Sequence, residues 1–484
     1  MLTLDTTAGL RPPKDAGRAA KLYRAAWRWH FYAGLYVIPF FMMLAVTGMA
    51  MLWIAWIDGR DGERTTVPVL DAPMSISAQA EAAQAIWPEG TLAQYIAPRT
   101  EDLAAIFRVN TQDGAMMAVV DPYTANVIET FSRRSGWYDT MDNIHGELLI
   151  GMIGDRMIEI AASLGIVLIA TGLYLWWPRD GAGLGALVPR LTASGRSLWK
   201  SLHASVGIWI SVFLLFFLLS GLAWTGVWGG KMVQGWSGFP AGKYGDIPLS
   251  DLTHKDLNGG RSEVPWALEK TPLPASQMDE HADHNTSGSG VAMAMTGTSA
   301  GADPDIDRID AFARSIGFQG RYQLNPPKDE TGVWSISRDS MSTDTLDPTS
   351  DRIVHVDRYS GNLLADVRYA DYSLLGKAMA IGITLHMGTL GLWSVLANTL
   401  FCLSVIFLCV SGVMMWWKRR PAGSLRLAAP PAPRQMPHWK GATAVALALS
   451  LAFPMAGLAI AAVLLLDVLV LSRFGAAPSE PLVS

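Results

Sequence analysis

The feature that most constrains this chain is an uncharged apolar run in its C-terminal quarter. Residues 378–417 contain no Asp, Glu, Lys or Arg. A membrane-spanning helix needs about 20 apolar residues, so this run is long enough to cross a bilayer. A soluble protein has about 25% charged residues, whereas this chain has 17% charged and 50% hydrophobic residues. The sequence therefore predicts an integral membrane protein.

Five stretches are long and apolar enough to be spans, and the last of them has two interpretations. It carries Pro454 near its middle, so it is either one kinked span or a tight hairpin, and the side on which the C-terminus lies is open. The first is too long for a cleaved signal peptide and is interpreted as a retained anchor. The five stretches are Phe31–Ile57, about Ile160–Trp177, Leu202–Trp228, about Leu396–Trp417 and Ala442–Leu466.

Basic residues orient these spans. Lys and Arg residues precede the first span, lie between the second and third, and follow the fourth. The positive-inside rule places those regions in the cytoplasm, so the N-terminus is cytoplasmic and the long segments 58–140 and 229–375 lie on the outer side. The net charge of -4 leaves no basic surface for nucleic acid, which is therefore not an expected partner.

The chain contains two copies of one unit. In each copy a histidine is followed by a glycine four residues later, and by a hydroxyl residue and a second glycine 17 and 18 residues later. The two series are His30, Gly34 and Thr47-Gly48, and His203, Gly207 and Ser220-Gly221. A further histidine in each copy precedes the returning span, which ends in a Thr-Gly or Ser-Gly pair and two tryptophans. These elements are His145, Thr171-Gly172 and Trp176-Trp177, and His386, Ser411-Gly412 and Trp416-Trp417.

The two long outer segments repeat as well. Each has a helical stretch, short strand-like runs, and an Asp-x-Tyr-x-x-Asn turn that predicts a hairpin between the last two strands. The predicted helices are Ser77–Trp87 and Ile309–Ile316, the strands Ala104–Val109, Met116–Val120, Val333–Ser337 and Arg352–Val356, and the turns Asp121–Val127 and Asp357–Leu363. Each copy is therefore expected to be a span, a small α+β domain outside, and a span back.

The repeat selects four of the nine histidines: His30, His145, His203 and His386. Taken singly, a histidine near a membrane helix is ordinarily a buried or interfacial hydrogen-bonded residue. Placing imidazole in lipid is costly, however, and here it occurs in matched positions. Imidazole is the usual axial ligand of haem iron. We predict that these four residues are cofactor-binding residues whose nitrogens bind haem iron.

Depth in the membrane decides how the four histidines pair. His30 and His203 begin outward-running helices near the cytoplasmic face, whereas His145 and His386 precede inward-running helices near the outer face. A pair made of His30 and His145 would have to bridge a core of about 30 Å, which one porphyrin cannot do. We therefore predict a first pair, His30 with His203, and a second pair, His145 with His386, each around one haem.

Gly34 and Gly207 lie one helical turn after the first pair, on the same helix face as the histidines. They are predicted to belong to the cofactor site, because a glycine there leaves room for a flat macrocycle. Close packing between helices explains a glycine equally well.

Two other motifs give weaker indications of a functional site. The stretch Met278–Met295 has histidines and methionines that suit a soft metal, but its Ser, Gly and Ala content is typical of a disordered loop. Gly181–Gly185 lacks the spacing of a dinucleotide-binding loop. The chain therefore has no visible flavin or nicotinamide site, and the electrons that its haems would carry must come from another molecule.

The sequence resembles the PepSY-associated transmembrane helix family of bacterial inner-membrane proteins. The resemblance covers most of residues 20–475 and rests on the histidine and hydroxyl–glycine motifs, the paired tryptophans and the two Asp-x-Tyr-x-x-Asn turns. Some members look like di-haem reductases that deliver electrons to periplasmic ferric-siderophore complexes. The resemblance implies two haem b groups, a multi-pass inner-membrane location with periplasmic loops, and a role in iron acquisition. Met278–Met295 departs from the family pattern.

We therefore expect a membrane-bound, haem-dependent reductase. Quinol or a cytoplasmic reductase would supply electrons, which would pass by way of the first and second pairs to a ferric siderophore or another periplasmic acceptor. Membrane lipid is the other expected partner. Two further functions are open. A non-catalytic PepSY-like binding or regulatory protein leaves the matched histidines without a role, and an iron or haem permease lacks the ionisable residues that line an ion path.

The expected fold is an α-helical membrane protein with about five spans, a tandem two-helix repeat and two small α+β PepSY-like periplasmic domains. The boundaries expected along the chain are an N-terminal segment 1–28, span 29–57, outer domain 58–140, histidine segment and span 141–178, loop 179–200, span 201–229, outer domain 230–375 with a disordered insertion at about 278–303, histidine segment and span 376–418, loop 419–440, span or hairpin 441–473, and tail 474–484.

Overall fold

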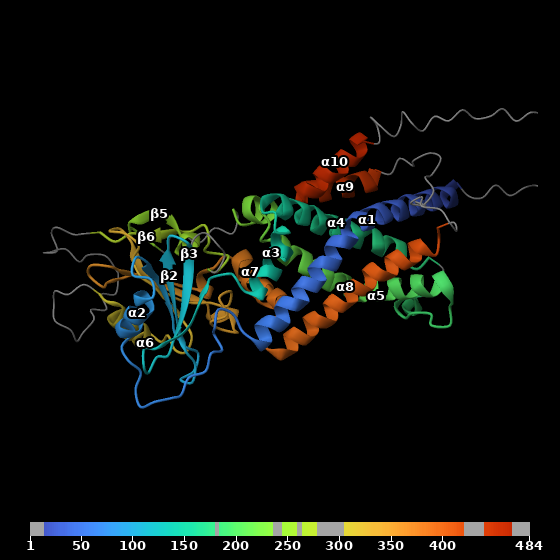
Figure 1. Ribbon diagram of the computed structural model, residues 1–484. Coiled ribbons are helices and arrows are strands. Elements are labelled where there is room, and N and C mark those ends of the chain that lie inside the picture. The colour runs from blue at the N-terminus through green and yellow to red at the C-terminus, as the bar shows by residue number, and fades with distance from the viewer. Residues whose placement is uncertain are drawn as a thin grey trace, which may run out of the picture. The chain divides into compact units, whose positions relative to one another are not determined.

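The computed structural model describes residues 14–179, 183–235, 244–258, 264–277, 304–420 and 440–466 (Figure 1). The insertion Met278–Met295, most of the loop before the fifth stretch and the tail lie outside these residues. The chain divides into two compact units. A helical unit comprises residues 1–46, 146–229 and 401–484, and a sheet unit comprises 47–145 and 230–400.

Four helices of the described chain are long and apolar enough to cross a membrane, so the protein is a multi-pass membrane protein. They are α1 (Lys14–Ile57), α4 (Met152–Trp176), α5 (Gly195–Leu222) and α8 (Leu392–Trp417). Large apolar side chains stay exposed on them, for example Val212 on α5 and Leu400 on α8. A bilayer would cover these side chains, as expected for lipid-facing positions.

The third span ends earlier than predicted, at Leu222 instead of Trp228. The carboxylate of Glu159, fully buried on α4, accepts hydrogen bonds from the backbone N–H groups of Val227 (3.2 Å) and Trp228 (2.8 Å). These N–H groups are therefore not available to continue the helix. A short π-helix, η2 (Trp228–Val233), follows instead.

Among the described residues, the predicted fifth stretch is not one continuous helix. Its residues make two shorter helices, α9 (Lys440–Ala452) and α10 (Pro454–Leu466), which diverge from a common corner in Figure 1. A Cβ atom on Gly457 would lie 3.2 Å from the Cα atom of Ser450, so the chain folds back on itself at Phe453. Thirteen residues rise about 20 Å, less than the hydrocarbon core of about 30 Å. The hairpin interpretation is therefore correct, because Pro454 breaks the helix.

The sheet unit is built on one eight-stranded antiparallel sheet in the order β10-β9-β8-β7-β1-β2-β3-β4. The predicted turns at Asp121 and Asp357 join β3 to β4 and β9 to β10. The strands are β1 (Thr91–Ile96), β2 (Ala105–Thr111), β3 (Gly114–Val120), β4 (Val127–Ser132), β7 (Gln323–Asn325), β8 (Val333–Arg338), β9 (Arg352–Asp357) and β10 (Leu363–Arg368).

The expectation of two separate outer domains needs correction. Each copy contributes four strands, and the two halves join where β1 pairs with β7, with Tyr95 opposite Leu324 and Ile96 opposite Gln323. A four-stranded sheet leaves open edges with unpaired backbone groups, and pairing two such edges satisfies them. The repeated α+β units therefore share a single sheet.

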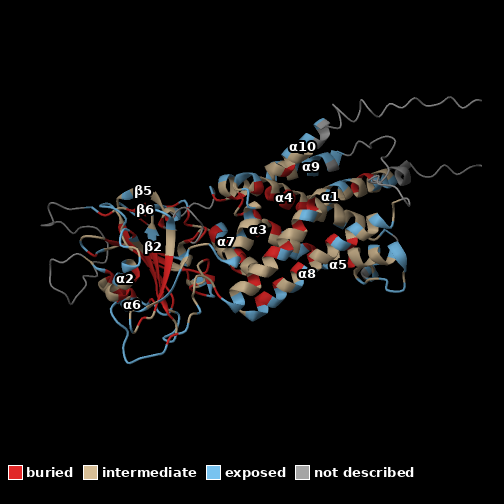
Figure 2. Cartoon of the chain, viewed as in Figure 1, coloured by how far each residue is buried: buried red, intermediate tan, exposed pale blue. Residues whose placement is uncertain are grey.

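The two faces of this sheet differ. Helices α2 (Ile76–Ala85) and α6 (Ile306–Ser315) cover one face, where Tyr95, Phe107 and Leu324 form a buried apolar core. Figure 2 shows the buried residues concentrated in these strands. The opposite face carries polar and charged side chains from the alternate positions, because successive residues of a strand point to opposite faces. It is called the polar face below.

Short elements flank the polar face and complete the unit. They are β5 (Leu249–Thr253), η4 (His254–Asn258), β6 (Pro272–Pro274), η5 (Pro348–Ser350) and η6 (Tyr369–Asp371), while η1 (Gly183–Leu187) belongs to the helical unit. Each half of the sheet is followed along the chain by a short helix that bears a predicted ligand: α3 (Trp137–Glu147) carries His145, and α7 (Leu374–Met387) carries His386.

Candidate haem-binding histidine pairs

The first pair joins two membrane-spanning helices. His30 on α1 and His203 on α5 are both half-buried, and their ring centroids lie 6.4 Å apart with the ring planes at 88°. Two metal–nitrogen bonds of about 2 Å each, together with the half-widths of two imidazole rings, account for a separation of this size. The gap between the rings therefore suits one metal ion held by both.

A hydroxyl group sets the tautomer of His30. Its Nδ1 atom lies 2.9 Å from Oγ1 of Thr171 on α4. The Thr171 hydroxyl donates its own hydrogen to the carbonyl of Val167 at 2.7 Å, so its oxygen is left to accept from Nδ1–H. The lone pair of the neutral ring therefore lies on Nε2, which is the nitrogen available to a metal.

His203 repeats this arrangement in the second copy. Its Nδ1 atom lies 2.7 Å from Oγ of Ser411 on α8, and the Ser411 hydroxyl donates to the carbonyl of Leu408 at 3.0 Å. By the same argument Nε2 of His203 carries the lone pair. Both rings of the first pair are thus fixed in the form that binds a metal, each by a hydroxyl from another span.

The glycines that follow Thr171 and Thr47 lie against histidine rings. A Cβ atom on Gly172 would lie 3.3 Å from Cε1 of His30, and one on Gly48 would lie 3.4 Å from Cε1 of His145. The first distance is tighter than nine in ten real Cβ contacts, and the second is at the short end of ordinary contact. The Thr-Gly motif therefore combines an acceptor for Nδ1 with a flat surface against which the ring packs.

The second pair lies in the sheet unit. Nδ1 of His145 lies 2.9 Å from Oγ1 of Thr47 on α1, and His145 is close enough to His386 to interact with it electrostatically. Next to His386, Gly388 ends α7 in the left-handed conformation (φ 68°). The side-chain amide of Asn398 donates to the carbonyls of Leu385 and His386 at 2.8 and 3.1 Å. These contacts fix the end of the helix that carries His386.

The glycines one turn after the first pair have open space beside them. A Cβ atom on Gly34 would meet only Cδ2 of Leu168, at 4.0 Å, and one on Gly207 would meet only Cδ2 of Leu408, also at 4.0 Å. Close packing between helices would bring neighbouring atoms nearer than this. The space therefore favours the interpretation that these glycines accommodate a flat bound group.

The donor sets suit haem better than a bare metal ion. Within the described residues, no three or more His, Cys, Asp or Glu side chains converge to hold a metal ion. A structural or catalytic zinc site uses three or four protein ligands, whereas a porphyrin leaves only the two axial positions of its iron to the protein. Two histidines whose rings lie 6.4 Å apart, each with its Nδ1 atom bound to a hydroxyl, fit that requirement.

The hydroxyl partners of the histidines were not predicted from the sequence. Thr47, Thr171 and Ser411 were recognised only as markers of the repeat, and their contacts with histidines of other helices give them a role. The available signal was the recurrence of the hydroxyl–glycine pair once for each selected histidine. A metal-ligating histidine generally donates its other nitrogen to such a partner.

Two further histidines form a buried pair within the sheet unit. Nδ1 of His254 lies 2.8 Å from the carbonyl of Thr271, which only accepts, so it carries a hydrogen. Nε2 of His254 then accepts from Nε2–H of His355 at 3.0 Å, and Nδ1 of His355 accepts from the Ser335 hydroxyl at 2.9 Å. Burial lowers the pKa of His254 to about 4 and also lowers that of His355. Both rings are neutral and fully bonded, which is typical of a structural pair.

Comparison with known proteins identifies the family. No curated protein is similar enough to the chain to count as a match. The family described as the PepSY-associated TM region matches residues 27–419, which include α4, α5 and α8, all but the start of α1, and both histidine pairs. The match extends over far more than half of the chain, and the protein therefore belongs to the PepSY-associated TM family.

Proposed function

We propose that the protein is a di-haem oxidoreductase of the bacterial inner membrane. It passes electrons from quinol or a cytoplasmic reductase to a ferric siderophore or a similar periplasmic acceptor, and so serves iron acquisition. The observation that carries the proposal is the first pair: two half-buried imidazoles on facing spans, 6.4 Å apart, each with Nε2 left free by a hydroxyl on Nδ1. In the orientation that the positive-inside rule predicts, the N-terminus is cytoplasmic and the sheet unit is periplasmic.

In this function some residues of the chain would bind the two haems and others would orient the ligands. His30 and His203 would hold the first haem b, and His145 and His386 the second. Thr47, Thr171 and Ser411 orient the rings and raise the basicity of the ligating nitrogens. A haem with two histidine ligands supplies a reversible one-electron carrier. Movement of an electron outward across an inside-negative membrane is favourable by about 2.3 kcal/mol per 100 mV.

Reduction explains how iron would leave the chelator. One electron converts the chelated Fe(III) to Fe(II), and the donor on the other side of the membrane is oxidised by one electron. Siderophore oxygens are hard ligands, which suit the smaller and more highly charged ferric ion, so the reduced ion is bound more weakly. The same electron that is accepted therefore releases the metal.

The test is an optical spectrum of the detergent-purified full chain, oxidised and dithionite-reduced. We expect two b-type haems per chain, loss of one in His203→Ala, and loss of the other in His386→Ala. His281→Ala, a histidine that the repeat does not select, serves as the control and should keep both. If the protein is produced in cells with an ample supply of haem and is folded but colourless, the proposal is refuted and a binding or regulatory role is favoured. Loss of both haems in either variant would contradict the pairing.

A further inference from the structure

One arginine at the end of a span lies against the helix that carries His30. Arg419 follows α8 by two residues, and its backbone N–H donates to the carbonyl of Trp416 at 3.0 Å. Its guanidinium lies 5.0 Å from the ring centroid of Trp27 and 5.1 Å from that of Phe31, both on α1. These two residues come three before and one after His30, so Arg419 lies within about one helical turn of His30 along α1. All of them belong to the helical unit.

Two comparable arginines have different neighbours. Arg420 stacks over a tryptophan ring of its own helix, at 3.7 Å from the ring centroid. Arg179 stands two residues after the tryptophan pair of the first copy, as Arg419 does in the second copy. It lies over the ring of Tyr23 at 5.2 Å, seven residues or about two helical turns before His30. Of these three arginines, Arg419 is therefore the one that lies beside a predicted iron ligand.

The helices near Arg419 contain almost no acidic residues. Residues 16–57, 195–222 and 372–466 have no Asp or Glu, and they include nearly all of α1 and the whole of α5 and α8. A second cation, Arg196, stands on α5 seven residues before His203 and is close enough to act on the charge of Arg419. Like charges repel each other, whereas a carboxylate near both attracts both. A carboxylate that balances these charges therefore comes from outside these stretches.

Haem b is a group that carries such carboxylates. Its two propionates project from one edge of the porphyrin, while the iron at its centre takes axial ligands from the protein. An arginine binds a carboxylate through parallel N–H groups at the edge of its guanidinium, and aromatic rings stack on the face of the same group. The contacts of Arg419 with Trp27 and Phe31 are therefore compatible with carboxylate binding, and they limit the orientations of its guanidinium.

We infer that Arg419 binds a propionate of the haem held by the first pair, an inference that rests on the proposed function. Arg419 directly follows α8, and Ser411 on the same helix holds Nδ1 of His203. One helix therefore orients a ligand of the iron and also binds the carboxylate edge of the ring. In the orientation that the positive-inside rule predicts, this edge faces the cytoplasm.

The experiment measures the rate of haem transfer from the full chain in detergent to apomyoglobin. In a His386→Ala background, which should keep only the haem of the first pair, Arg419→Gln should raise this rate about tenfold, the effect of one charge-assisted pair. Arg419→Lys should raise it less, because the charge remains. Arg420→Gln and Arg179→Gln remove the same charge at the comparable positions and should leave the rate unchanged. In a His203→Ala background, the haem of the second pair should not respond to Arg419→Gln.

Haem without free carboxylates separates propionate binding from a structural role. When the apoprotein of the His386→Ala background is reconstituted with iron protoporphyrin dimethyl ester, Arg419→Gln should no longer change the rate. Equal rates for Arg419→Gln and Arg420→Gln with haem b overturn the inference and leave the reductase intact. An effect of Arg419→Gln that persists with the ester does the same, and indicates helix packing or an anionic lipid at Arg419. A first pair that holds no haem overturns the proposed function as well. If Arg419→Gln does not fold, Arg419→Lys is judged by the same two comparisons.

Discussion

The two histidine pairs have matched ligands but are held by different parts of the molecule. His30 and His203 stand on spans, and hydroxyls of two other spans hold their Nδ1 atoms. His145 and His386 stand on α3 and α7, short helices that follow the last strand of each half of the sheet. The first pair therefore depends on the packing of the membrane helices alone. The second pair also depends on the sheet unit, to which α3 and α7 belong.

The largest expected effect comes from weakening the seam of the sheet. Leu324 is fully buried on β7, opposite Tyr95, and Leu324→Ala should cost about 2–5 kcal/mol of unfolding free energy. We expect the haem of the second pair to be lost at a lower temperature, while that of the first pair keeps its transition. Thermal melting followed by haem absorbance measures both. Leu249→Ala, at an exposed position of β5, is the control, and equal losses at both pairs would contradict the comparison.

A smaller effect is expected from acidification of the sheet unit. The pKa of His254 is about 4 in the folded protein and 6.5 as its ordinary value. The unfolded state thus binds the extra proton first, and stability present above pH 6.5 is lost as the pH falls toward 4. At pH 5 the loss is on the order of 2 kcal/mol. Hydrogen exchange of the amides around His254 and Thr271 at pH 7.5 and 5 measures it.

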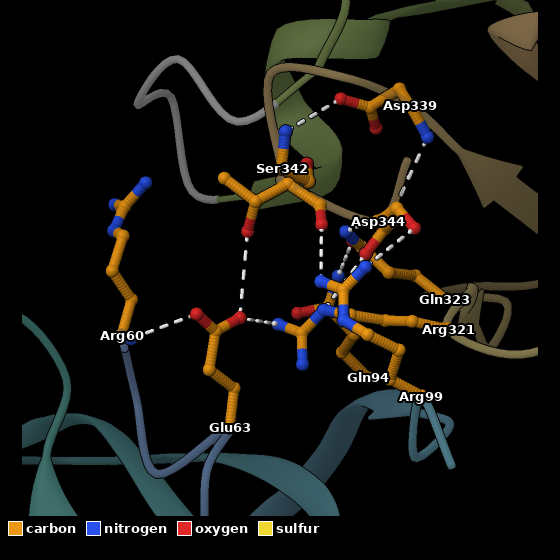
Figure 3. A network of polar contacts seen from close by, with 10 residues as sticks. Arg60, Glu63, Gln94, Arg99, Arg321, Gln323, Asp339, Ser342 and Asp344 are labelled. Carbon is orange, nitrogen blue, oxygen red and sulfur yellow. Dashed lines mark hydrogen bonds and ion pairs between the residues drawn. The ribbon is translucent and has the colours of Figure 1, made fainter. Parts of the chain in front are cut away.

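The control for this pH effect is His254→Gln. Burial raises the pKa of Asp339, Asp344 and Asp351 in the segment that joins β8 to β9, and Figure 3 shows the first two. The folded protein therefore gains stability from these carboxylates as the pH falls, which opposes the effect of the histidines. The contribution of His254 is therefore the difference between the wild type and His254→Gln. Identical pH dependence in the two proteins would show that the pair of neutral histidines has no such role.

The smallest of these effects concerns the hydroxyl partners. Thr171→Val removes the acceptor of His30 Nδ1, and Thr47→Val removes that of His145. Each should weaken retention of one haem by about tenfold, the first pair in one variant and the second pair in the other. Transfer of haem to apomyoglobin measures retention, and Thr171→Ser should restore it. A loss at the wrong pair would break the assignment of hydroxyls to histidines.

Much of the architecture could be predicted because it depends on local patterns. The four spans, the turns at Asp121 and Asp357 and the two-copy organisation each follow from hydrophobic runs or from repeated residues. The hydroxyl–histidine contacts could not, since Thr171 and His30 are 141 residues apart and no local pattern states which helices face each other. The end of α5 was missed for a similar reason, because Glu159 of another helix binds the N–H groups beyond it.

By itself the sequence determined the membrane class, the duplication and the four histidines, because apolar length and matched spacing are properties of the chain read in order. Only the tertiary structure decided that the two outer halves share one sheet, that the fifth stretch is a hairpin, and that Arg419 lies over the ring of Phe31. Strand edges, helix faces and charged groups interact with whatever lies next to them in space, and these neighbours are often far away in the sequence. Which residues become neighbours is settled only when the chain packs into its tertiary structure.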